Sequence, residues 1–515
     1  MSSADRFYVT TPIYYVNDVP HIGHAYTTIA CDAMARFARL DGKETRFLTG
    51  TDEHGQKVEK AARDRGIEPQ VFTDELSQRF RDLAAHMGIS NDDFIRTTED
   101  RHKRGVQALW KTLVEKGEIY LGSYAGWYAV RDEAFYTESE LIDGKAPTGA
   151  PVEWVEEPSY FFRLSAWQQK LLTFYEENPD FIAPQSRRNE VISFVKSGLQ
   201  DLSVSRTSFS WGIPVPGDPD HVVYVWLDAL TNYMTALGYP DTDTDTYEKY
   251  WPADVHVIGK DILRFHAIFW PAFLMAAGLE PPKRVYAHGW WTIEGEKMSK
   301  SLNNALDPYE LIETYGLDQL RYFLLREVPF GNDGDFSRTA MINRINADLA
   351  NDYGNLCQRV LSMIAKNSGG KVPLPSPVEE HEDDAALHRE AEALLGRVRE
   401  TMESQALHKA LEAIFDVVGL ANRYVDAQAP WALRKTDPER MGAVLYHLAE
   451  TIRRLALLTQ AFMPAASEKI LDQLAVPAEQ RTLGFYPSER GRLEPGSALP
   501  KPSGVFPRYV DEAAA

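Results

Sequence analysis

The stretch FYVTTPIYYVNDVPHIGH at residues 7–24 sets the organisation of the chain. Its first part, Phe7–Thr11, is an apolar run typical of a β-strand, and prolines punctuate the loop that follows. The stretch ends in His-Ile-Gly-His at 21–24, and a helical pattern of apolar residues continues from there to Leu40. The expected order is therefore strand, loop, His-x-Gly-His and helix.

The His-x-Gly-His motif has the chemistry of a phosphate site. The start of a helix carries unpaired N–H groups and a partial positive charge, and both attract anions. Gly23 has no side chain, so a flat ligand can lie against the backbone, while His21 and His24 can each donate a hydrogen bond. The alternative is a turn with two surface histidines. The preceding strand and the following helix favour a nucleotide site.

Composition predicts a multidomain globular protein. The 515 residues are too many for one core, and 44% hydrophobic with 25% charged residues is an ordinary balance. The first residues, MSSADRF, lack a signal-peptide pattern, and the longest apolar run (265–279) is too short to cross a bilayer. Only Cys31 and Cys357 occur, so disulfides and cysteine-rich metal sites have little part. We expect a cytoplasmic protein.

The formal net charge of −20 argues against indiscriminate binding to nucleic acid. Arginines and lysines gathered on one face could still form a local footprint, so a specific nucleic-acid partner stays possible.

The first part of the chain alternates strands and helices. After the helix to Leu40 we expect a strand at 44–49 and then helices near 54–66, 70–88 and 100–116. This βαβα order predicts a parallel sheet with helices on both faces, and ligands of such sheets lie beyond the C-terminal ends of the strands. Asp52 and the loop at 21–24 both follow strand ends, which predicts one shared pocket.

Residues 118–205 have a different texture, rich in Tyr, Trp, Glu and Gly, which predicts small antiparallel strands. Helices near 166–177 and 188–199 close this segment, and we interpret it as an insertion into the sheet domain. The α/β pattern then resumes. We expect strands at 221–226, 254–258 and 285–291, and helices from Asp228 and over 262–277.

Residues 292–304, TIEGEKMSKSLNN, resemble a mobile basic loop. The spacing of Lys297 and Lys300 lets both ammonium groups reach one polyphosphate, although an ordinary solvated turn is the plainer interpretation of a lone K-x-x-K. No Walker-type glycine loop occurs in the sequence, so any ATP is held in another way.

From about residue 338 the pattern is helical throughout. Apolar residues recur at helical spacing near 338–366, 382–402, 406–427 and 439–463, which predicts a helix bundle. Residues 476–515 are rich in Pro and Gly and are expected to form an extended tail.

His21-Ile22-Gly23-His24 and Lys297-Met298-Ser299-Lys300-Ser301, in this order on a split α/β domain, resemble the paired HIGH and KMSKS motifs of class I aminoacyl-tRNA synthetases. The intervening sequence resembles the bacterial methionyl-tRNA synthetases along nearly the whole chain. The matching stretches are TPIYYVNDVPHIGH (11–24), GTDEHG (50–55), YVWLDALTNY (224–233), IGKDILRFHAIFWPA (258–272), AHGWW (287–291), KMSKS (297–301) and YVDAQAPW (424–431).

The resemblance implies an α/β fold: a Rossmann-type catalytic domain with an inserted small α+β connective-peptide domain, followed by an α-helical anticodon-binding bundle. The expected divisions are catalytic halves at 1–117 and 206–285, the insertion at 118–205, a KMSKS and stem-contact region at 286–345, the anticodon domain at 346–475 and a tail at 476–515.

The resemblance also implies the reaction. ATP and methionine form methionyl-adenylate and pyrophosphate, and the methionyl group passes to the 3′ end of methionine tRNA. In-line attack on the α-phosphate needs positioning and charge neutralisation rather than a protein nucleophile. The expected catalytic residues, which would stabilise phosphate charge together with Mg²⁺, are His21, His24, Lys297 and Lys300. The expected ATP-binding residues are Asn17, Gly23, Gly259, Asp261, His288, Met298 and Lys300.

The methionine pocket must bury a thioether and hold an ammonium group. By resemblance, Asp52 pairs with the ammonium, helped by the backbone near Ile13. The side chain would be enclosed by Tyr15, Trp226, Leu230, Tyr233, Ile262 and His266. Aromatic walls suit a polarisable sulfur, and Tyr233 or His266 could offer it a weak hydrogen bond. Ordinary core packing is the alternative for each aromatic residue, most clearly for Trp226 taken alone.

In the helical domain, Asn355, Arg359 and Trp431 fall where the family reads the CAU anticodon. Trp431 could stack on an unpaired base while the other two bond base edges, and Asp426 could repel wrong anticodons. The alternative for Trp431 is a packing residue at a helix start.

The sequence departs from the family in the insertion. Many members carry cysteine-rich zinc knuckles there, but Ala129 and Asp132 stand where one C-x-x-C pair would lie, and the second pair is missing near 145–148. We therefore expect no bound metal in a zinc-free insertion, held by Trp127, Tyr128, Phe135, Tyr136 and Trp154. At about 90 residues the insertion is too short for the hydrolytic editing domain of the related valine, leucine and isoleucine enzymes. Because some relatives carry a further C-terminal dimer-forming domain that this sequence lacks, a monomer is expected.

The leading hypothesis is thus a tRNA ligase with ATP, L-methionine and tRNA(Met) as partners and no membrane association. One alternative is a nucleotidyltransferase that shares HxGH, which the helical domain argues against. Another is a non-catalytic tRNA-binding paralogue, which the intact His21, His24, Asp52 and Lys300 argue against. A synthetase for Leu, Ile, Val or Cys remains open in principle, but these enzymes need an editing insertion or zinc-ligand cysteines.

Overall fold

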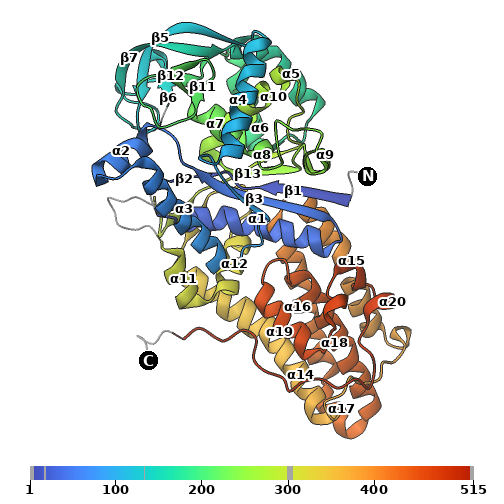
Figure 1. Ribbon diagram of the computed structural model, residues 1–515. Helices are drawn as coiled ribbons and strands as arrows, with labels where there is room; N and C mark the ends of the chain where they lie inside the picture. Colours follow the sequence, from blue (N-terminus) through green and yellow to red (C-terminus); the bar gives the residue numbers. More distant parts are fainter. Residues whose placement is uncertain (1–4, 17–18, 133, 298–305, 511–515) are drawn as a thin grey trace. The chain divides into compact units, whose positions relative to one another are not determined.

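The structure of the chain is a computed structural model that describes residues 5–16, 19–132, 134–297 and 306–510. The backbone divides into two compact units, and Figure 1 shows the elements of each. One unit comprises residues 6–20 and 46–288. The other comprises residues 1–5, 21–45 and 289–515.

The unit of residues 6–20 and 46–288 is built on a parallel sheet with the neighbour order β2-β3-β1-β13-β14-β8, in which β4 also pairs with β3. The strands are β1 (Arg6–Thr10), β2 (Tyr14–Tyr15), β3 (Glu44–Asp52), β4 (Asp93–Arg96), β8 (Ile182–Ala183), β13 (Val255–Gly259) and β14 (Val285–His288). In this order β1 lies between β3 and β13, so the sheet joins strands that precede the insertion in the sequence to strands that follow it. The expected split parallel sheet is therefore confirmed.

Helices pack around this sheet, most of them where the sequence predicts them; the short helix at 245–250 was not predicted. They are α2 (Gln56–Arg65), α3 (Pro69–His86), α4 (Asp100–Glu115), α5 (Gln168–Glu177), α6 (Gln185–Lys196), α7 (Val225–Leu230), α8 (Asn232–Thr235), α9 (Asp245–Tyr250) and α10 (Trp270–Ala277). The apolar faces of α4–α10 join the sheet residues Tyr8, Leu48 and Ile258 in one large core, and α2 and α3 form a second cluster with Tyr14 and Phe94, because a sheet covered by helices must bury both faces.

The insertion is the antiparallel module that its alternating sequence predicts. The long strands β5 (Ile119–Ala129) and β7 (Glu153–Phe162) pair along their length, and β6 (Ala134–Tyr136) and β9 (Leu202–Ser203) flank them. The rings of Trp127 and Trp154 meet edge to face at 5.3 Å across this pairing. Smaller strands β10 (Ser205–Arg206), β11 (Pro214–Val215) and β12 (Asp218–Val223) form a separate sheet.

Several segments differ from the sequence prediction. The strand expected at 285–291 is divided, since β14 ends at His288 and another strand begins at Trp291, and the helix expected at 338–366 contains a π-helical segment, Ile345–Gly354. The strand expected at 221–226 ends at Val223, and Val225 and Trp226 already belong to α7. The β-branched and aromatic residues that favour a strand continue past its end into the helix. The helix expected at 262–277 is not uniform: a π-helical segment, Phe265–Phe269, precedes α10. Apolar periodicity does not distinguish these helix types.

The other unit begins with α1 (Ile22–Leu40), the helix that follows His21. A small sheet pairs β15 (Trp291–Ile293) with β16 (Glu296–Lys297) and β17 (Gly334–Phe336), and α11 (Pro308–Tyr315) and α12 (Leu317–Arg326) lie between these strands in the chain. Within this unit α1 packs on α12, where the fully buried Arg321 binds Asp32 at 2.7 Å.

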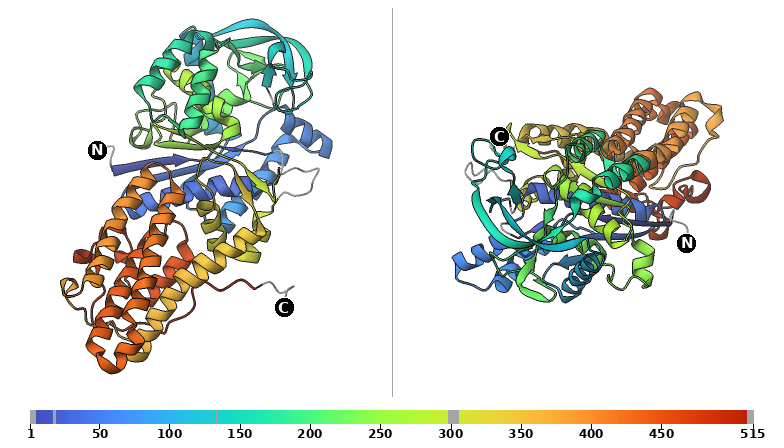
Figure 2. Two further views of the ribbon diagram at one scale, coloured as in Figure 1. Left: turned by 180° about the vertical axis from the view of Figure 1, so that it is seen from behind. Right: turned by 90° about the horizontal axis from the view of Figure 1, so that it is seen from above.

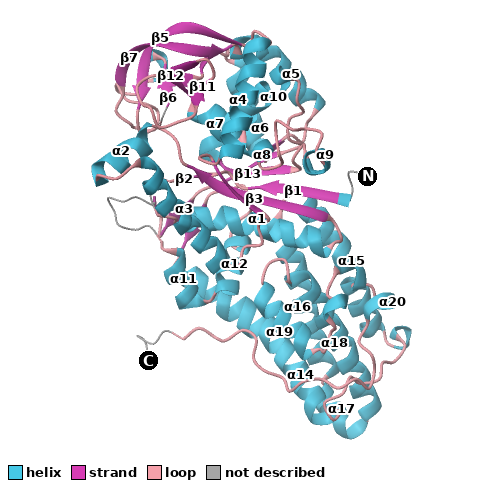
Figure 3. Ribbon diagram, viewed as in Figure 1, coloured by secondary structure: helices cyan, strands magenta, loops and turns pink. Residues whose placement is uncertain are grey.

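The rest of this unit is a helix bundle, drawn almost entirely as helix in Figure 3. Its members are α13 (Arg338–Arg344), a π-helical segment (Ile345–Gly354), α14 (Asn355–Asn367), α15 (Glu382–Glu403), α16 (Leu407–Gln428), α17 (Pro430–Thr436), α18 (Pro438–Thr459), α19 (Pro464–Gln473) and the short α20 (Ser488–Gly491). Helices α15, α16 and α18 pack on one another, as the orange-to-red ribbons of Figure 2 show. The expected bundle is confirmed.

The tail runs back over this bundle and is held by backbone bonds. Gly496 donates to the carbonyl of Val372 at 2.8 Å, and further along Asn346 exchanges two hydrogen bonds with the backbone of Tyr509. Across the described ranges, no helix is both long and apolar enough to cross a membrane.

Candidate active site and anticodon surface

His21 and His24 form a reciprocal cap at the start of α1. The Nδ1 atom of His21 accepts from the backbone N–H of Gly23 at 3.1 Å, and Nδ1 of His24 accepts from the backbone N–H of His21 at 3.0 Å. The two rings lie 4.0 Å apart between centroids. Because Nδ1 accepts in both rings, each neutral imidazole carries its proton on Nε2.

The charge state of His24 follows from its burial. Burial first, and the neighbouring His21 second, hold the pKa of His24 well below its usual value. His24 is therefore neutral at pH 7, so it can act on a phosphate as a hydrogen-bond donor rather than as a cation. Sequence reasoning identified the donor role of this residue but not its charge state.

Gly23 is required sterically between these rings. A Cβ atom built on Gly23 would lie 2.9 Å from Cε1 of His21, closer than carbon atoms approach without displacement. The expected reason for this glycine was access for a flat ligand. The structure adds a second reason, which is room for the capping imidazole.

The KMSKS segment begins in the same unit as His21. The hairpin of β15 and β16 pairs Thr292 with Lys297, and the carbonyl of Leu306 accepts from the backbone N–H of Ile22 at 3.3 Å. Residues on both sides of the segment are thus defined, and its C-terminal side is bonded to the HIGH motif. Met298 and Lys300 lie outside the described residues, as does Asn17.

Three of the expected ATP-binding residues meet at the ends of β13 and β14. Gly259 and His288 are register partners of these two strands. A Cβ on Gly259 would lie 2.5 Å from Oδ1 of Asp261 and 4.0 Å from Cε1 of His288, so the carboxylate folds over the glycine. Their position at the C-terminal edge of a parallel sheet is where such sheets bind nucleotides.

The polar residues of the expected methionine pocket form one hydrogen-bonded chain. Nδ1 of His266 lies 3.0 Å from the carbonyl oxygen of Ile262, and since a carbonyl only accepts, this nitrogen carries the proton. Burial lowers the pKa of His266 to about 4, so Nε2 is unprotonated at pH 7. The hydroxyl of Tyr233, 2.7 Å from Nε2, must therefore donate to it.

These hydrogen bonds change one expectation about how the pocket would contact the thioether sulfur. Tyr233 and His266 were each considered as donors of a weak hydrogen bond to a thioether sulfur. In the structure the hydroxyl proton of Tyr233 points at His266 and the ring proton of His266 points at Ile262. A bond to sulfur would require one of them to leave its partner.

The other residues of the expected pocket belong to the same unit, and Trp226 contacts His266 directly. Trp226 is stacked on Phe265 with ring centroids 3.7 Å apart, and it meets His266 edge to face at 6.1 Å. Leu230 is buried in the main core, and Ile13 and Ile262 are partly buried against it. Tyr15 and Asp52 are register partners at the ends of β2 and β3, which makes the expected ammonium ligand a neighbour of an expected wall residue.

The structure therefore assembles the expected residues in groups. His21, Gly23 and His24 belong to one unit, whereas the methionine-pocket residues and Gly259, Asp261 and His288 belong to the other. The pocket expected to be shared between them stays a prediction.

Sequence reasoning missed the buried polar residues that hold these groups. Glu53, next to Asp52, is fully buried and accepts from Arg96 twice (2.7 and 2.9 Å), from Thr51 at 2.7 Å and from Thr98 at 2.6 Å. His54 lies 2.6 Å from a carboxylate oxygen of Asp228, which is also fully buried. Charged residues next to a predicted ligand in GTDEHG and YVWLDALTNY were the available signal, since charges are seldom fully buried without partners.

The expected anticodon residues come together on the bundle. Arg359 binds Asp426 at 2.7 Å, and its guanidinium lies 5.5 Å from the ring centroid of Trp431. Trp431 is 51% exposed, and Asn355 is exposed one helical turn before Arg359 on α14. An exposed aromatic ring beside a guanidinium can stack on an unpaired base.

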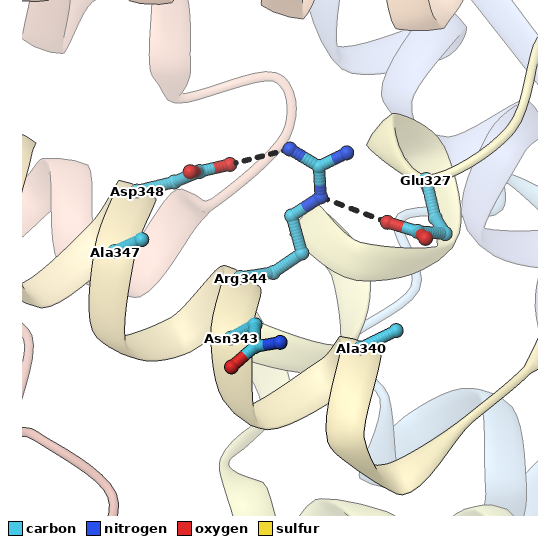
Figure 4. A pocket seen from close by; sticks show the side chains of 6 residues that line it. All are labelled: Glu327, Ala340, Asn343, Arg344, Ala347 and Asp348. Atoms are coloured by element: carbon cyan, nitrogen blue, oxygen red, sulfur yellow. Dashed lines mark hydrogen bonds and ion pairs between the residues drawn. The ribbon is translucent and has the colours of Figure 1, made fainter.

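A groove of about 300 Å³ lies elsewhere in this unit (Figure 4), lined by Glu327, Ala340, Asn343, Arg344, Ala347 and Asp348. Its arginine is held between two carboxylates, Glu327 at 2.8 Å and Asp348 at 3.0 Å. This neutralisation makes the groove unsuited to a phosphate, and none of the expected site residues line it.

The insertion replaces the expected zinc-knuckle positions with polar bonds and alanine packing. Asp132 accepts hydrogen bonds from Thr148 and from Tyr136, the latter at 3.1 Å. A small apolar cluster of Ala129, Ala146 and Ala150 lies beside them. Within the part of the chain that the structure describes, no group of three or more His, Cys, Asp or Glu residues is arranged to hold a metal.

The split parallel sheet, the HIGH cap and the helical domain together define a class I aminoacyl-tRNA synthetase. A family model described as "tRNA synthetases class I (M)" matches residues 7–153 and 139–361, and one described as "Anticodon binding domain of methionyl tRNA ligase" matches residues 374–515. Within that class, the chain belongs to the methionine–tRNA ligase family.

Known relatives match over the full length. The methionine–tRNA ligases of Mesorhizobium japonicum and Brucella suis are 59% and 60% identical to this chain, covering 100% and 99% of it and 99% of each relative. A structure of Mycobacterium tuberculosis methionyl-tRNA synthetase in complex with methionyl-adenylate matches with a TM-score of 0.95 at 54% identity, covering 98% of this chain and 100% of that one.

Proposed function

We propose that this chain activates L-methionine with ATP and transfers the methionyl group to the 3′ end of tRNA(Met), for initiation and elongation of protein synthesis in the cytoplasm. The observation that carries the proposal is the Trp226–His266–Tyr233 group, an aromatic cluster with neutral polar residues, within a full-length match to the methionine–tRNA ligases. Such a cluster suits an uncharged thioether, because it offers polarisable walls and no charge.

Activation requires methionine and ATP to be held in line. Asp52 is the proposed partner of the ammonium group, Ile13 contributes its backbone, and Tyr15, Trp226, Leu230 and Ile262 enclose the side chain. Gly259, Asp261 and His288 are proposed to hold the nucleoside of ATP, where the close approach of Asp261 to Gly259 supports a ribose contact. Holding both reactants in one geometry supplies much of the rate enhancement.

Charge on the phosphates grows as the carboxylate of methionine attacks the α-phosphate. His21 and His24 are proposed to donate from Nε2 to this charge, a role that their shared cap supports by fixing both tautomers. Lys297 and Lys300 are proposed to neutralise the leaving pyrophosphate. Asn17, Gly23 and Met298 complete the proposed ATP site.

Mg²⁺ is proposed to enter with ATP, whose phosphate oxygens are ligands of the kind that this ion prefers. It would neutralise phosphate charge when bound. The described residues provide no three-ligand group for a resident metal, so the chain's own contribution is the set of donors named above.

Transfer requires selection of the tRNA. Asn355, Arg359 and Trp431 are proposed to bind the anticodon, and the position of Arg359 between Asp426 and Trp431 supports a preformed reading surface. The domain divisions expected from the sequence and a monomeric state are part of the same proposal.

Amino-acid-dependent exchange of pyrophosphate into ATP, measured with each of the twenty amino acids, tests the proposal. Exchange with methionine alone is expected, followed by charging of tRNA(Met) in an aminoacylation assay. Exchange with a different amino acid would overturn the pocket assignment. A folded protein that catalyses no exchange would overturn the ligase function and favour a tRNA-binding paralogue.

A further inference from the structure

A buried chain of hydrogen bonds connects four segments within the unit of residues 6–20 and 46–288. The two carboxylate oxygens of Asp228 lie 2.6 Å from Nδ1 of His54 and 2.7 Å from Nε2 of His102. Nδ1 of His102 lies 2.9 Å from the hydroxyl of Thr235. All four side chains are buried, and Asp228 and His102 have no exposed surface.

Three of the four hydrogen-bonded residues lie two positions from a proposed methionine ligand in the sequence. His54 is two residues after Asp52. Asp228 is two residues after Trp226 and two before Leu230 on α7, and Thr235 is two residues after Tyr233 on α8. His102, on α4, touches both Asp228 and Thr235. The segments that carry the proposed ammonium ligand and the proposed thioether-binding residues are therefore connected by hydrogen bonds to the carboxylate of Asp228.

The two hydrogen bonds to Asp228 require a carboxylate at this position. Burial alone would raise the pKa of Asp228, but the contacts with His54 and His102 hold it below its usual range, so the group is a carboxylate. A carboxylate accepts from two imidazole N–H groups at once. An amide at the same position has one acceptor oxygen and one NH₂ group, so one of the imidazoles would have to change its tautomer or lose its bond.

Glu53 provides a comparison on the same loop. It is also a fully buried carboxylate, and its partners are Arg96, Thr51 and Thr98. Thr51 precedes Asp52 in the chain, but none of these partners belongs to α7 or α8. The Glu53 network anchors the loop after β3 without reaching α7 or α8.

We propose that Asp228 is a positioning residue for methionine binding. Through its hydrogen bonds to His54 and His102, and through the bond of His102 to Thr235, it holds Asp52, Trp226 and Tyr233 in fixed relative positions. The inference rests on the proposed function, because the ligand roles of Asp52, Trp226 and Tyr233 are part of it. Asp228 itself touches no reacting atom in this scheme. Its effect on the reaction is exerted through the residues that it holds.

The test compares Asp228→Asn with Glu53→Gln in the full chain, by pyrophosphate exchange and by calorimetric titration with methionine. For Asp228→Asn we expect the KM and the Kd for methionine to rise at least about tenfold, while the KM for ATP stays within about twofold. For Glu53→Gln, whose hydrogen bonds do not reach α7 or α8, we expect a lower unfolding temperature and a smaller rise of the Kd for methionine than in Asp228→Asn. A role in folding alone would not separate methionine from ATP.

A second pair keeps the inference testable if Asp228→Asn does not fold. His102→Gln retains a donor near the Nε2 position, whereas His102→Leu removes it. We expect His102→Gln to bind methionine more tightly than His102→Leu, with equal KM values for ATP. Equal methionine binding by the two variants would overturn the inference.

Other outcomes separate the inference from the function on which it rests. A folded Asp228→Asn with unchanged methionine KM, or a Glu53→Gln that weakens methionine binding equally, overturns the positioning role while wild-type exchange upholds the function. Wild-type protein without methionine-dependent exchange overturns the proposed function itself. Unchanged methionine binding in Asp52→Asn and Trp226→Ala overturns the ligand assignment.

Discussion

Individual side chains in this protein often have a structural role beside the chemical one that the sequence suggests. His21 accepts the N–H of Gly23 and His24 accepts the N–H of His21, so both imidazoles complete a helix N-terminus through Nδ1. The remaining ring nitrogen carries the proton. Capping thereby selects the tautomer that the proposed chemistry needs.

The fit of Gly23 against His21 predicts the effect of a methyl group. Gly23→Ala would place Cβ 2.9 Å from the His21 ring, so the ring must rotate away from its cap. We expect pyrophosphate exchange to fall by at least about a hundredfold, as for loss of a preorganised donor, with a nearly unchanged unfolding temperature. Gly396→Ala, on α15 with open space around it, serves as the control and should retain full exchange. Full exchange in Gly23→Ala would contradict the steric argument.

His266 predicts a pH dependence of stability. Burial lowers its pKa from 6.5 to about 4, so between these values the unfolded chain binds a proton that the folded chain does not. The contribution of His266 is therefore complete above pH 6.5 and is lost as the pH falls towards 4, by about 2 kcal/mol at pH 5. His266→Gln should reduce the loss of unfolding free energy between pH 7 and pH 5, measured by urea titration. An identical loss in the variant would show that His266 does not titrate in this way.

At the scale of elements, α1 is held from its middle as well as from its start. Arg321 on α12 is fully buried, binds Asp32 of α1 at 2.7 Å and donates from Nε to the carbonyl of Phe462 at 2.7 Å. The first turn of α19 is also bonded to α12, because the backbone N–H of Ala466 donates to Asp318 at 2.6 Å. The helix that carries the HIGH histidines is thus anchored to the helical domain within one unit.

Loss of this anchor should be costly. Arg321→Met would leave Asp32 buried with Arg36 as its remaining basic partner, and removing one member of a buried ion pair costs about 3–5 kcal/mol. Combining it with Asp32→Asn removes the buried carboxylate that has lost Arg321, so the double variant should be less destabilised than the sum of the single ones by at least about 1 kcal/mol. Urea unfolding of the four proteins measures this coupling. Additive effects would mean that the pair contributes no interaction of its own.

The whole molecule separates two proposed tasks, activation and tRNA selection, between residues far apart in the sequence. Arg359 contacts both Asp426 and Trp431, although the chain carries a formal charge of −20. A local reading surface can therefore exist on an acidic protein, since contact with a base depends on the arrangement of a few side chains rather than on net charge.

Trp431→Ala should separate the two tasks. Stacking of one base on an aromatic ring contributes about 1–3 kcal/mol, so kcat/KM for tRNA(Met) in aminoacylation should fall about tenfold to a hundredfold. Pyrophosphate exchange, which needs no tRNA, should stay at the wild-type rate. Leu374→Ala, an apolar residue of the same unit that is 75% exposed, is the control and should leave both assays unchanged. A parallel loss of exchange would contradict an anticodon role for Trp431.

The sequence alone predicted the main elements, the split α/β fold and the family, because these depend on local apolar periodicity and on motifs that are contiguous in the chain. It also named Tyr233, His266, Arg359 and Trp431 as site candidates. The sequence did not distinguish a π-helix from an α-helix, because the π-helical segment at 265–269 has the same apolar pattern as an α-helix.

Protonation states, tautomers and long-range partners follow from the folded arrangement of the chain. The neutral state of His266 depends on burial and on Ile262, and the roles of Glu53 and Asp228 depend on Arg96, His54 and His102, which lie far from them in the chain or on other elements. The physical reason is that burial and electrostatic interactions are properties of the assembled interior. A residue's type and its sequence neighbours do not specify which distant groups will surround it.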